Sequence, residues 1–128
     1  MKQFSLENKR ILITGATAGI GKQCALTLHA AGAELILTGR DKSRLDEICQ
    51  QTSSTGILAD LSSSEGVKTL ADQVENLDGI IHSAGIVKPF PVSFVGPKHI
   101  NDVQSINFNA PVELTSLLLK KKKVNDNG

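Results

Sequence analysis

Short apolar runs alternate along this chain with longer segments in which apolar residues recur every three or four positions. The apolar runs are nearly continuous and are bounded by turn residues, which is typical of strands buried on both faces of a parallel sheet. Strands are therefore predicted over residues 11–14, 35–38, 56–59 and 79–82. The longer segments have the spacing of helices that bury one face.

Helices are predicted over about 19–31, from Asp41, from Ser62, and over about 99–123. Asp41 is a favourable N-cap, and Ser62 with Glu65 has the spacing of a capping box. Pro111 lies inside the last helix and should kink it or weaken one hydrogen bond. The repeated strand–helix units predict a doubly wound α/β fold with right-handed crossovers, in one domain over residues 1–128.

Composition narrows the possible functions. The formal net charge is +1, so nothing indicates a nucleic-acid partner or an acidic membrane surface. No apolar run approaches the ~20 residues that span a bilayer. Cys24 and Cys49 fall in predicted helices without metal-ligand spacing, and we interpret them as reduced thiols rather than as a disulfide or a redox pair. These features predict a cytoplasmic protein without a metal site.

The strongest chemical signal is the stretch Thr14-Gly15-Ala16-Thr17-Ala18-Gly19-Ile20-Gly21, between the first predicted strand and the first predicted helix. A helix start exposes unpaired N–H groups and a partial positive charge, and both attract phosphate oxygens. Gly15, Gly19 and Gly21 would shape a tight turn that a ligand can approach closely. The backbone after Gly19, including Ile20, would face the phosphates and nicotinamide side of a cofactor. The alternative is a tight turn without a ligand.

This string resembles the classical short-chain dehydrogenase/reductase family, and it is similar in style to 3-oxoacyl-carrier-protein reductases. The resemblance covers about residues 7–128. It implies a Rossmann-type parallel sheet of order 3-2-1-4 with flanking helices. The implied reaction is hydride transfer between a nicotinamide cofactor and a carbonyl or alcohol. Thr14 and Thr17 would join the glycines in the cofactor site.

Gly39 and Arg40 end the second predicted strand. NAD-selective sites carry an acidic side chain here, which accepts hydrogen bonds from the adenosine ribose. This chain has no acid at Gly39, and the Arg40 guanidinium suits the oxygens of a 2′-phosphate. The residues therefore favour NADP(H), with NAD(H) as the second choice. The alternative is a surface arginine before a helix.

Two further strand ends are candidate cofactor contacts through the resemblance. Asp60-Leu61 closes the third strand, where an Asp of the family lies near the adenine; the alternative is an Asp in the turn before a helix. Ser83-Ala84-Gly85 follows the fourth strand, where the family usually carries Asn-Asn-Ala-Gly. Ala84 and Gly85 match that pattern, whereas His82 is interpreted as a packed residue at the strand end.

Asn107 matches the helix Asn of the family's catalytic tetrad, which holds a water in the proton relay; the alternative is an ordinary polar helix position. The chain contains no Tyr, and the Ser, Tyr and Lys of that tetrad are absent. We therefore expect an incomplete, truncated domain that supplies the cofactor half and is inactive alone. A non-catalytic nucleotide-binding or partner-binding module and an unstable truncated product are the alternatives.

The expected partners follow from the same resemblance. In the full-length protein the substrate would be a small carbonyl or alcohol. A homo-oligomer is expected, because resembling enzymes use the last predicted helix in their oligomer contacts. That helix should have a partly uncovered apolar face that includes Phe108, Leu114 and residues 117–119. The outer edge of the fourth strand should be unpaired, which invites self-association.

Overall fold

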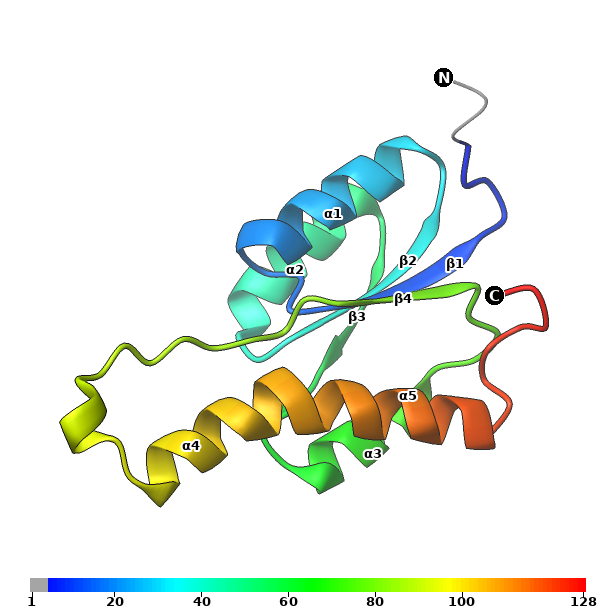
Figure 1. The fold of residues 1–128 in the computed structure, drawn as a ribbon. Coiled ribbons are helices and arrows are strands. Elements are labelled where there is room, and N and C mark those ends of the chain that lie inside the picture. Colours follow the sequence, from blue (N-terminus) through cyan, green and yellow to red (C-terminus); the bar gives the residue numbers. More distant parts are fainter. Residues whose placement is uncertain (1–4) are drawn as a thin grey trace.

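The computed structural model describes residues 5–128, and its centre is a four-stranded sheet (Figure 1). The strands are β1 (Arg10–Thr14), β2 (Glu34–Gly39), β3 (Thr55–Leu58) and β4 (Gly79–His82). They are parallel in the order β3-β2-β1-β4. The sequence-based prediction of a Rossmann-type sheet with this order is confirmed.

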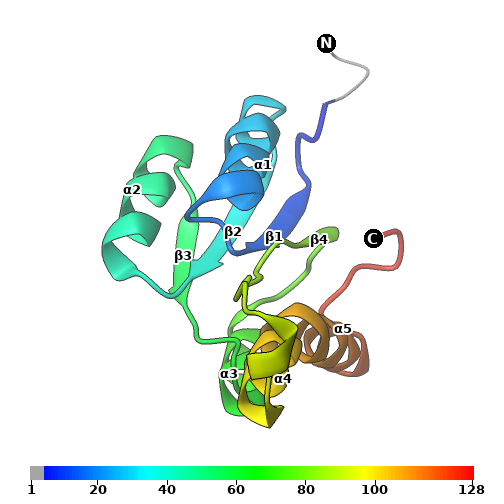
Figure 2. The ribbon, with the colours of Figure 1, turned by 60° about the vertical axis from the view of Figure 1, so that its left-hand side comes forward.

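Helices cover both faces of the sheet (Figure 2). One face carries α1 (Gly19–Ala30) and α2 (Lys42–Thr52), and the other carries α3 (Ser64–Gln73) and α5 (Ala110–Lys120). A short helix, α4 (Pro97–Gln104), extends α5 beyond the sheet, and a 3₁₀ turn, η2 (Val92–Phe94), precedes it. No helix within residues 5–128 has both the length and the apolar character needed to cross a bilayer.

The central strand β1 divides the core into two clusters, because successive side chains of a strand point to opposite faces. Ile11 and Ile13 pack with buried residues of β2, α1 and α2. Leu12, which is fully buried, packs instead with Leu70 of α3 and Leu114 of α5. Burial on both faces explains why the strand is almost purely apolar.

Two helix starts test the capping predictions. Asp41 is the N-cap of α2, and its carboxylate accepts a hydrogen bond from the Arg44 N–H at 3.1 Å, as predicted. The prediction of Ser62 as the first residue of the next helix is wrong by one position. Ser63 is the N-cap of α3 and accepts from the Gly66 N–H, whereas the Ser62 N–H donates to the Asp60 carboxylate.

The predicted helix over 99–123 forms, but it begins earlier, ends earlier and is interrupted. Between α4 and α5 lies a π-helical turn, η3 (Ser105–Asn109), closed by a hydrogen bond from the Ala110 N–H to the Ser105 carbonyl. Pro111 follows directly. Because proline has no N–H, it cannot donate to the Asn107 carbonyl four residues earlier. The expected local disturbance at Pro111 is therefore a wider turn of the helix.

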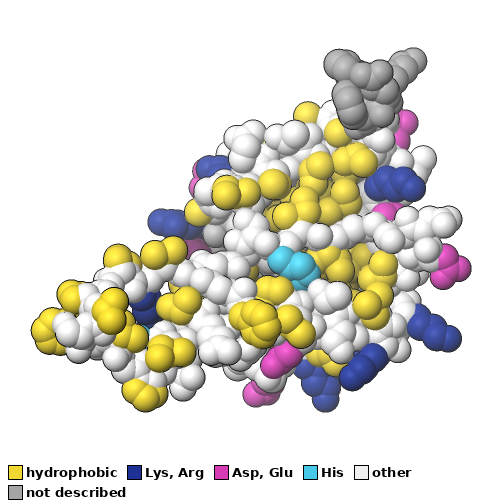
Figure 3. Space-filling view, viewed as in Figure 1, with side chains coloured by type: hydrophobic (Ala, Val, Ile, Leu, Met, Phe, Trp, Pro, Cys, Tyr) yellow, Lys and Arg dark blue, Asp and Glu magenta, His cyan; other side chains and the backbone are white. Residues whose placement is uncertain are grey.

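The apolar face of the last helix is less open than expected. Leu114 and Leu118 are fully buried against α3 and the sheet, so the expectation of an uncovered face is wrong for them. Phe108 and Leu119 are each 60% exposed. Figure 3 shows hydrophobic side chains gathered on this side of the molecule, over α5 and over the segment between β4 and α4.

The chain returns to the sheet after α5. Val124 forms a parallel bridge with Leu77, through hydrogen bonds from the Leu77 N–H to Lys123 and from the Asn125 N–H to Leu77. Within the described residues, β4 itself pairs with β1 on one side alone. The outer edge of β4 is thus open beyond this bridge, as expected.

Candidate functional site

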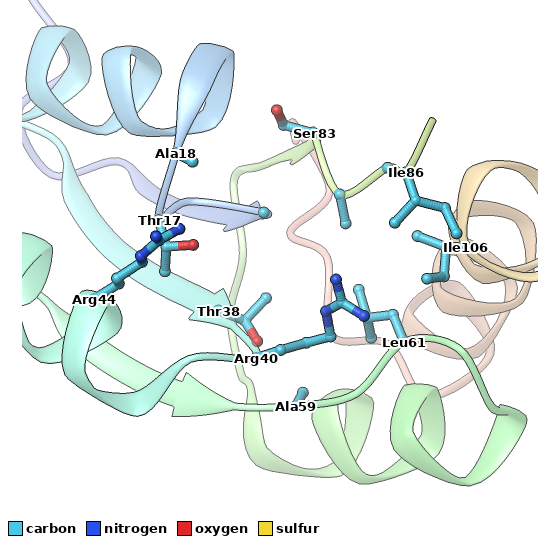
Figure 4. Close-up of a pocket in the computed structure, with 14 residues that line it drawn as sticks. Thr17, Ala18, Thr38, Arg40, Arg44, Ala59, Leu61, Ser83, Ile86 and Ile106 are labelled. Atoms are coloured by element: carbon cyan, nitrogen blue, oxygen red, sulfur yellow. The ribbon is translucent and has the colours of Figure 1, made fainter. Parts of the chain in front are cut away.

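A cavity of about 270 Å³ lies where the carboxyl ends of the parallel strands meet (Figure 4). Its lining comes from the turn after β1, the ends of β2 and β3, the segment after β4 and the first turn of η3. The lining residues are Gly15, Thr17, Ala18, Thr38, Gly39, Arg40, Arg44, Ala59, Leu61, Ser83, Ala84, Gly85, Ile86 and Ile106.

Two glycines of the turn after β1 are required by packing. Gly15 has φ +62°, and a Cβ there would lie 2.7 Å from the backbone N and Cα of Ala84. A Cβ on Gly21 would lie 2.0 Å from the Gly15 carbonyl oxygen. Both contacts are with backbone that cannot yield easily. These glycines let α1 start close beside the end of β4.

Gly19 differs from them because no atom lies within 4 Å of where its Cβ would be. It has φ +55° and is the first residue of α1, and the preceding Ala18 makes no side-chain capping bond. The first N–H groups of this 12-residue helix therefore receive no side-chain cap from Ala18. A backbone without a side chain, at a helix start that offers N–H donors, fits a pyrophosphate.

Thr14 fixes the turn to the other side of the cavity. Its side chain is buried, and its hydroxyl oxygen accepts hydrogen bonds from the N–H groups of Ser83 and Ala84 at 3.1 and 3.2 Å. A threonine at this position thus satisfies two backbone donors that β4 leaves at its end. The role of Thr14 in the structure is to join two cavity walls, and it does not itself line the cavity.

The end of β2 supplies positive charge. A Cβ on Gly39 would lie 2.6 Å from the Cγ2 methyl of Thr17, so a side chain there would force the Thr17 side chain to move. The Arg40 side chain extends from this point toward Leu61 (Figure 4). Arg44, from the first turn of α2, lines the same cavity on the side of Thr17. The described lining therefore holds two guanidinium groups and no carboxylate.

Thr38 adds a polar atom that the protein leaves without a hydrogen bond. The residue is 1% exposed, and its hydroxyl oxygen has no partner among the described residues. Buried hydroxyl groups normally have partners. A polar group of a bound ligand in this cavity would relieve that deficit once the neighbouring side chains adjust.

Asp60 is turned away from the cavity, whereas its neighbours Ala59 and Leu61 line it. The Asp60 carboxylate accepts a hydrogen bond from the Ser62 N–H at 2.9 Å. Hydrogen bonds from the side chain and backbone of Ser62, together with the charge of Arg40, lower the pKa of Asp60. The carboxylate thus shapes the turn before α3, and its predicted place near an adenine stays a prediction.

Asn107 lies in the π-helical turn η3 and clamps the segment that follows β4. Its side-chain oxygen accepts from the Ile86 N–H at 2.8 Å, and its side-chain NH₂ donates to the Ile86 carbonyl at 2.8 Å. Both ends of the amide are therefore occupied by one backbone unit. The expected role of Asn107 in holding a water stays a prediction.

His82 differs from the family's usual Asn and points out from the end of β4. Its ring nitrogen Nε2 lies 2.9 Å from the Thr115 hydroxyl of α5, and partial burial lowers the pKa of the imidazole. This contact ties β4 to α5, in line with the interpretation of His82 as a packed residue. Across residues 5–128, no cluster of His, Cys, Asp and Glu side chains is arranged to hold a metal ion.

The structure gathers most of the predicted cofactor residues around one cavity and leaves the others nearby. Gly19 lines a second, neighbouring cavity, and Ile20 is 78% exposed. The sequence analysis missed Arg44, Ile86 and Ile106 as lining residues. Arg44 could have been found, because it lies one helical turn after Arg40. Ile86 and Ile106 belong to no motif that the sequence makes visible.

Comparison with known proteins defines the class to which this site belongs. Residues 9–128 match the family model of the short chain dehydrogenases. The chain is 35% identical over 131 residues to the oxidoreductase YciK of Escherichia coli, across 92% of this chain and 52% of that protein. The cavity therefore belongs to a nucleotide-binding type of α/β fold that oxidoreductases use.

Solved structures give the same result. A short chain dehydrogenase from Shigella flexneri in complex with NADP has a TM-score of 0.82 and 34% identity, over 92% of this chain and 55% of that one. A protein provisionally named betaketoacyl-ACP reductase has a TM-score of 0.85 and 25% identity, over 91% of this chain and 52% of that one. This chain belongs to the short-chain dehydrogenase/reductase family, and it spans about half the length of these relatives.

Proposed function

We propose that this chain binds NADP(H) in the cavity at the carboxyl ends of its strands. The observation that carries the proposal is the charge of the cavity, which holds Arg40 and Arg44 without a carboxylate. An acidic residue at the end of β2 would repel a 2′-phosphate, whereas guanidinium groups pair with its oxygens. The Shigella flexneri relative, which was solved with NADP, supports the same cofactor.

The other parts of the site have matching roles in this proposal. The N–H groups at the start of α1, beside Gly19, would bind the pyrophosphate. The wall formed by Leu61 and Ile106 would pack against the adenine, with Asp60 close to it. The segment from Ser83 to Gly85 would support the nicotinamide half, and Asn107 would hold that segment through Ile86. The bound cofactor supplies the hydride that is exchanged with a carbonyl or alcohol carbon.

The remaining expectations belong to the whole protein. We propose that it is a homo-oligomeric, cytoplasmic oxidoreductase that acts on a small carbonyl or alcohol, and that residues 1–128 form its cofactor-binding part. The exposed Phe108 on η3 and Leu119 on α5 support a subunit contact.

Calorimetric titration at fixed salt tests the cofactor. We expect NADPH to bind more tightly than NADH, and the Arg40→Ala variant to bind the two cofactors more equally. A charge-assisted hydrogen bond contributes ~1.5–3 kcal/mol, which corresponds to roughly 10- to 100-fold. Equal affinities in the unchanged protein would refute the proposal.

A second candidate function is nucleotide binding without catalysis. It is favoured by the composition, since the 128 residues include no Tyr to act as the family's proton donor. A positioned acid/base contributes ~100- to 10,000-fold to a rate. In an NADPH-oxidation assay with ketone substrates we expect the 128 residues to give a rate at background, which agrees with either candidate. Clear turnover by these residues would refute the second candidate.

A further inference from the structure

Arg44 lines two neighbouring cavities. One is the main cavity, and the other lies between α1 and α2, where Arg44 is joined by Thr17, Ala18, Gly19, Lys22, Glu47 and Ile48. In Figure 4 its side chain lies beside Thr17 and reaches toward Ala18, whereas Arg40 extends toward Leu61. The two guanidinium groups therefore approach the cavity from different sides.

The Arg44 guanidinium is available for a ligand. Its backbone N–H is used by the Asp41 cap, but its side chain is 67% exposed. Within residues 5–128, the ion pair that restrains it is a loose one, with 3.8 Å between its Nε and the Asp41 carboxylate. The other charged groups around the second cavity are Lys22 and Glu47, which have opposite charges. The Arg44 guanidinium, which is planar and has several N–H donors, can therefore exchange its loose contact with Asp41 for hydrogen bonds to a phosphate.

We infer that Arg44 is a specificity residue that binds the 2′-phosphate of the cofactor from the α1 side, opposite Arg40. Ala18 provides backbone but no charge at this place, so Arg44 adds a guanidinium from α2 to the one that Arg40 supplies from the end of β2. Two arginines would then hold the phosphomonoester between them. The inference rests on the proposed function, because it deepens the assignment of NADP(H) to this cavity.

Isothermal titration with 2′,5′-ADP and with 5′-AMP isolates the phosphate that distinguishes the two cofactors, because these nucleotides differ only in the 2′-phosphate. For Arg44→Gln we expect 2′,5′-ADP affinity to fall about 3- to 30-fold and 5′-AMP affinity to be unchanged, the loss being reduced by the exposure of the side chain. Arg44→Lys keeps the positive charge but not the planar guanidinium with its several N–H donors. Its 2′,5′-ADP affinity should therefore lie between those of the unchanged protein and Arg44→Gln.

Lys42→Gln is the matched control. It removes the same charge from the same helix turn, but Lys42 pairs with Asp46 and does not line either cavity. We expect this variant to change the affinity for either nucleotide less than twofold, within the scatter expected for an exposed charge. An equal loss in Lys42→Gln and Arg44→Gln would show a general charge effect and would overturn the inference.

The same titrations separate this inference from the proposed function. If the unchanged protein does not distinguish 2′,5′-ADP from 5′-AMP, and Arg40→Gln has no effect, the proposed NADP(H) site fails. If the unchanged protein prefers 2′,5′-ADP and Arg40→Gln weakens that preference while Arg44→Gln does not, the role of Arg44 alone is refuted. A loss of both nucleotides in Arg44→Gln would also refute a contact specific to the 2′-phosphate.

Discussion

Gly19 and Gly21 lie two residues apart, and the structure predicts opposite consequences for replacing each with alanine. A Cβ at Gly21 would lie 2.0 Å from the Gly15 carbonyl oxygen, so α1 or the turn must move by more than an ångström. Overpacking of this severity against backbone costs at least about 3 kcal/mol. At Gly19 the space is open, and only the positive φ opposes a side chain, at about 1–2 kcal/mol.

For cofactor binding, we expect the substitution at Gly19 to have the direct effect, whereas the substitution at Gly21 acts on stability. A methyl group at Gly19 projects into the space where the proposed pyrophosphate approaches the start of α1. We expect Gly19→Ala to lose at least about tenfold in NADPH affinity while it stays folded. Gly21→Ala should instead fail through its stability.

Urea denaturation followed by circular dichroism measures the free energy of unfolding, and calorimetry measures the NADPH affinity of the variants that fold. Gly79→Ala is the control, since its Cβ would make an ordinary 3.7 Å contact with Ile11. The free energy of unfolding of that variant should lie within about 1 kcal/mol of the value for the unchanged protein. The reasoning is refuted if Gly21→Ala is as stable as Gly79→Ala, or if Gly19→Ala binds NADPH normally.

Three further side chains carry predictions. Thr14→Val leaves two buried N–H groups without an acceptor and should lower the free energy of unfolding in urea by about 2–4 kcal/mol, whereas Thr14→Ser should keep most of it. Asn107→Ala removes two hydrogen bonds to Ile86, so we expect a loss of about 1–2 kcal/mol and faster proteolysis within residues 86–96; unchanged proteolysis would contradict the clamp. Two lysines lower the pKa of Asp102 from 3.8 to about 2, so its stabilisation is complete above about pH 4 and is lost as the pH falls toward 2. The stability difference between the unchanged protein and Asp102→Asn should shrink over that range, and a pH-independent difference would show that the ion pairs do not contribute.

The sheet could be predicted from the sequence because its strands are buried on both faces. Residues such as Leu12 and Leu37 leave a continuous apolar run between turn residues, and few other structures produce that pattern. The order of the strands could not be predicted from this pattern, since no local feature of β4 indicates that it pairs with β1. That order came from the resemblance of the glycine-rich turn to a family.

Other features depend on contacts that local patterns do not encode. Pro111 indicated a disturbance in the last helix, but a kink and a π-helical turn are both compatible with a missing N–H. The choice of Ser63 over Ser62 as N-cap depends on Asp60, which takes the Ser62 N–H. The contribution of Arg44 depends on where α2 places its first turn relative to Thr17. Each of these outcomes is decided by a tertiary neighbour.

The hydrogen bonds that join Thr14 to Ser83 and Ala84 also bear on the order in which the protein folds. They connect residues 69 and 70 positions apart, whereas β1 and β2 pair across a single helix. Contacts between distant residues require closure of a long loop, so we expect β4 to dock after β1 and β2 have paired. Under the proposed function, NADP(H) spans both sides of this junction and binds the finished sheet but not its precursors. By mass action the bound cofactor then stabilises the state in which β4 is docked, so the fraction of chains that are fully folded depends on the cofactor concentration.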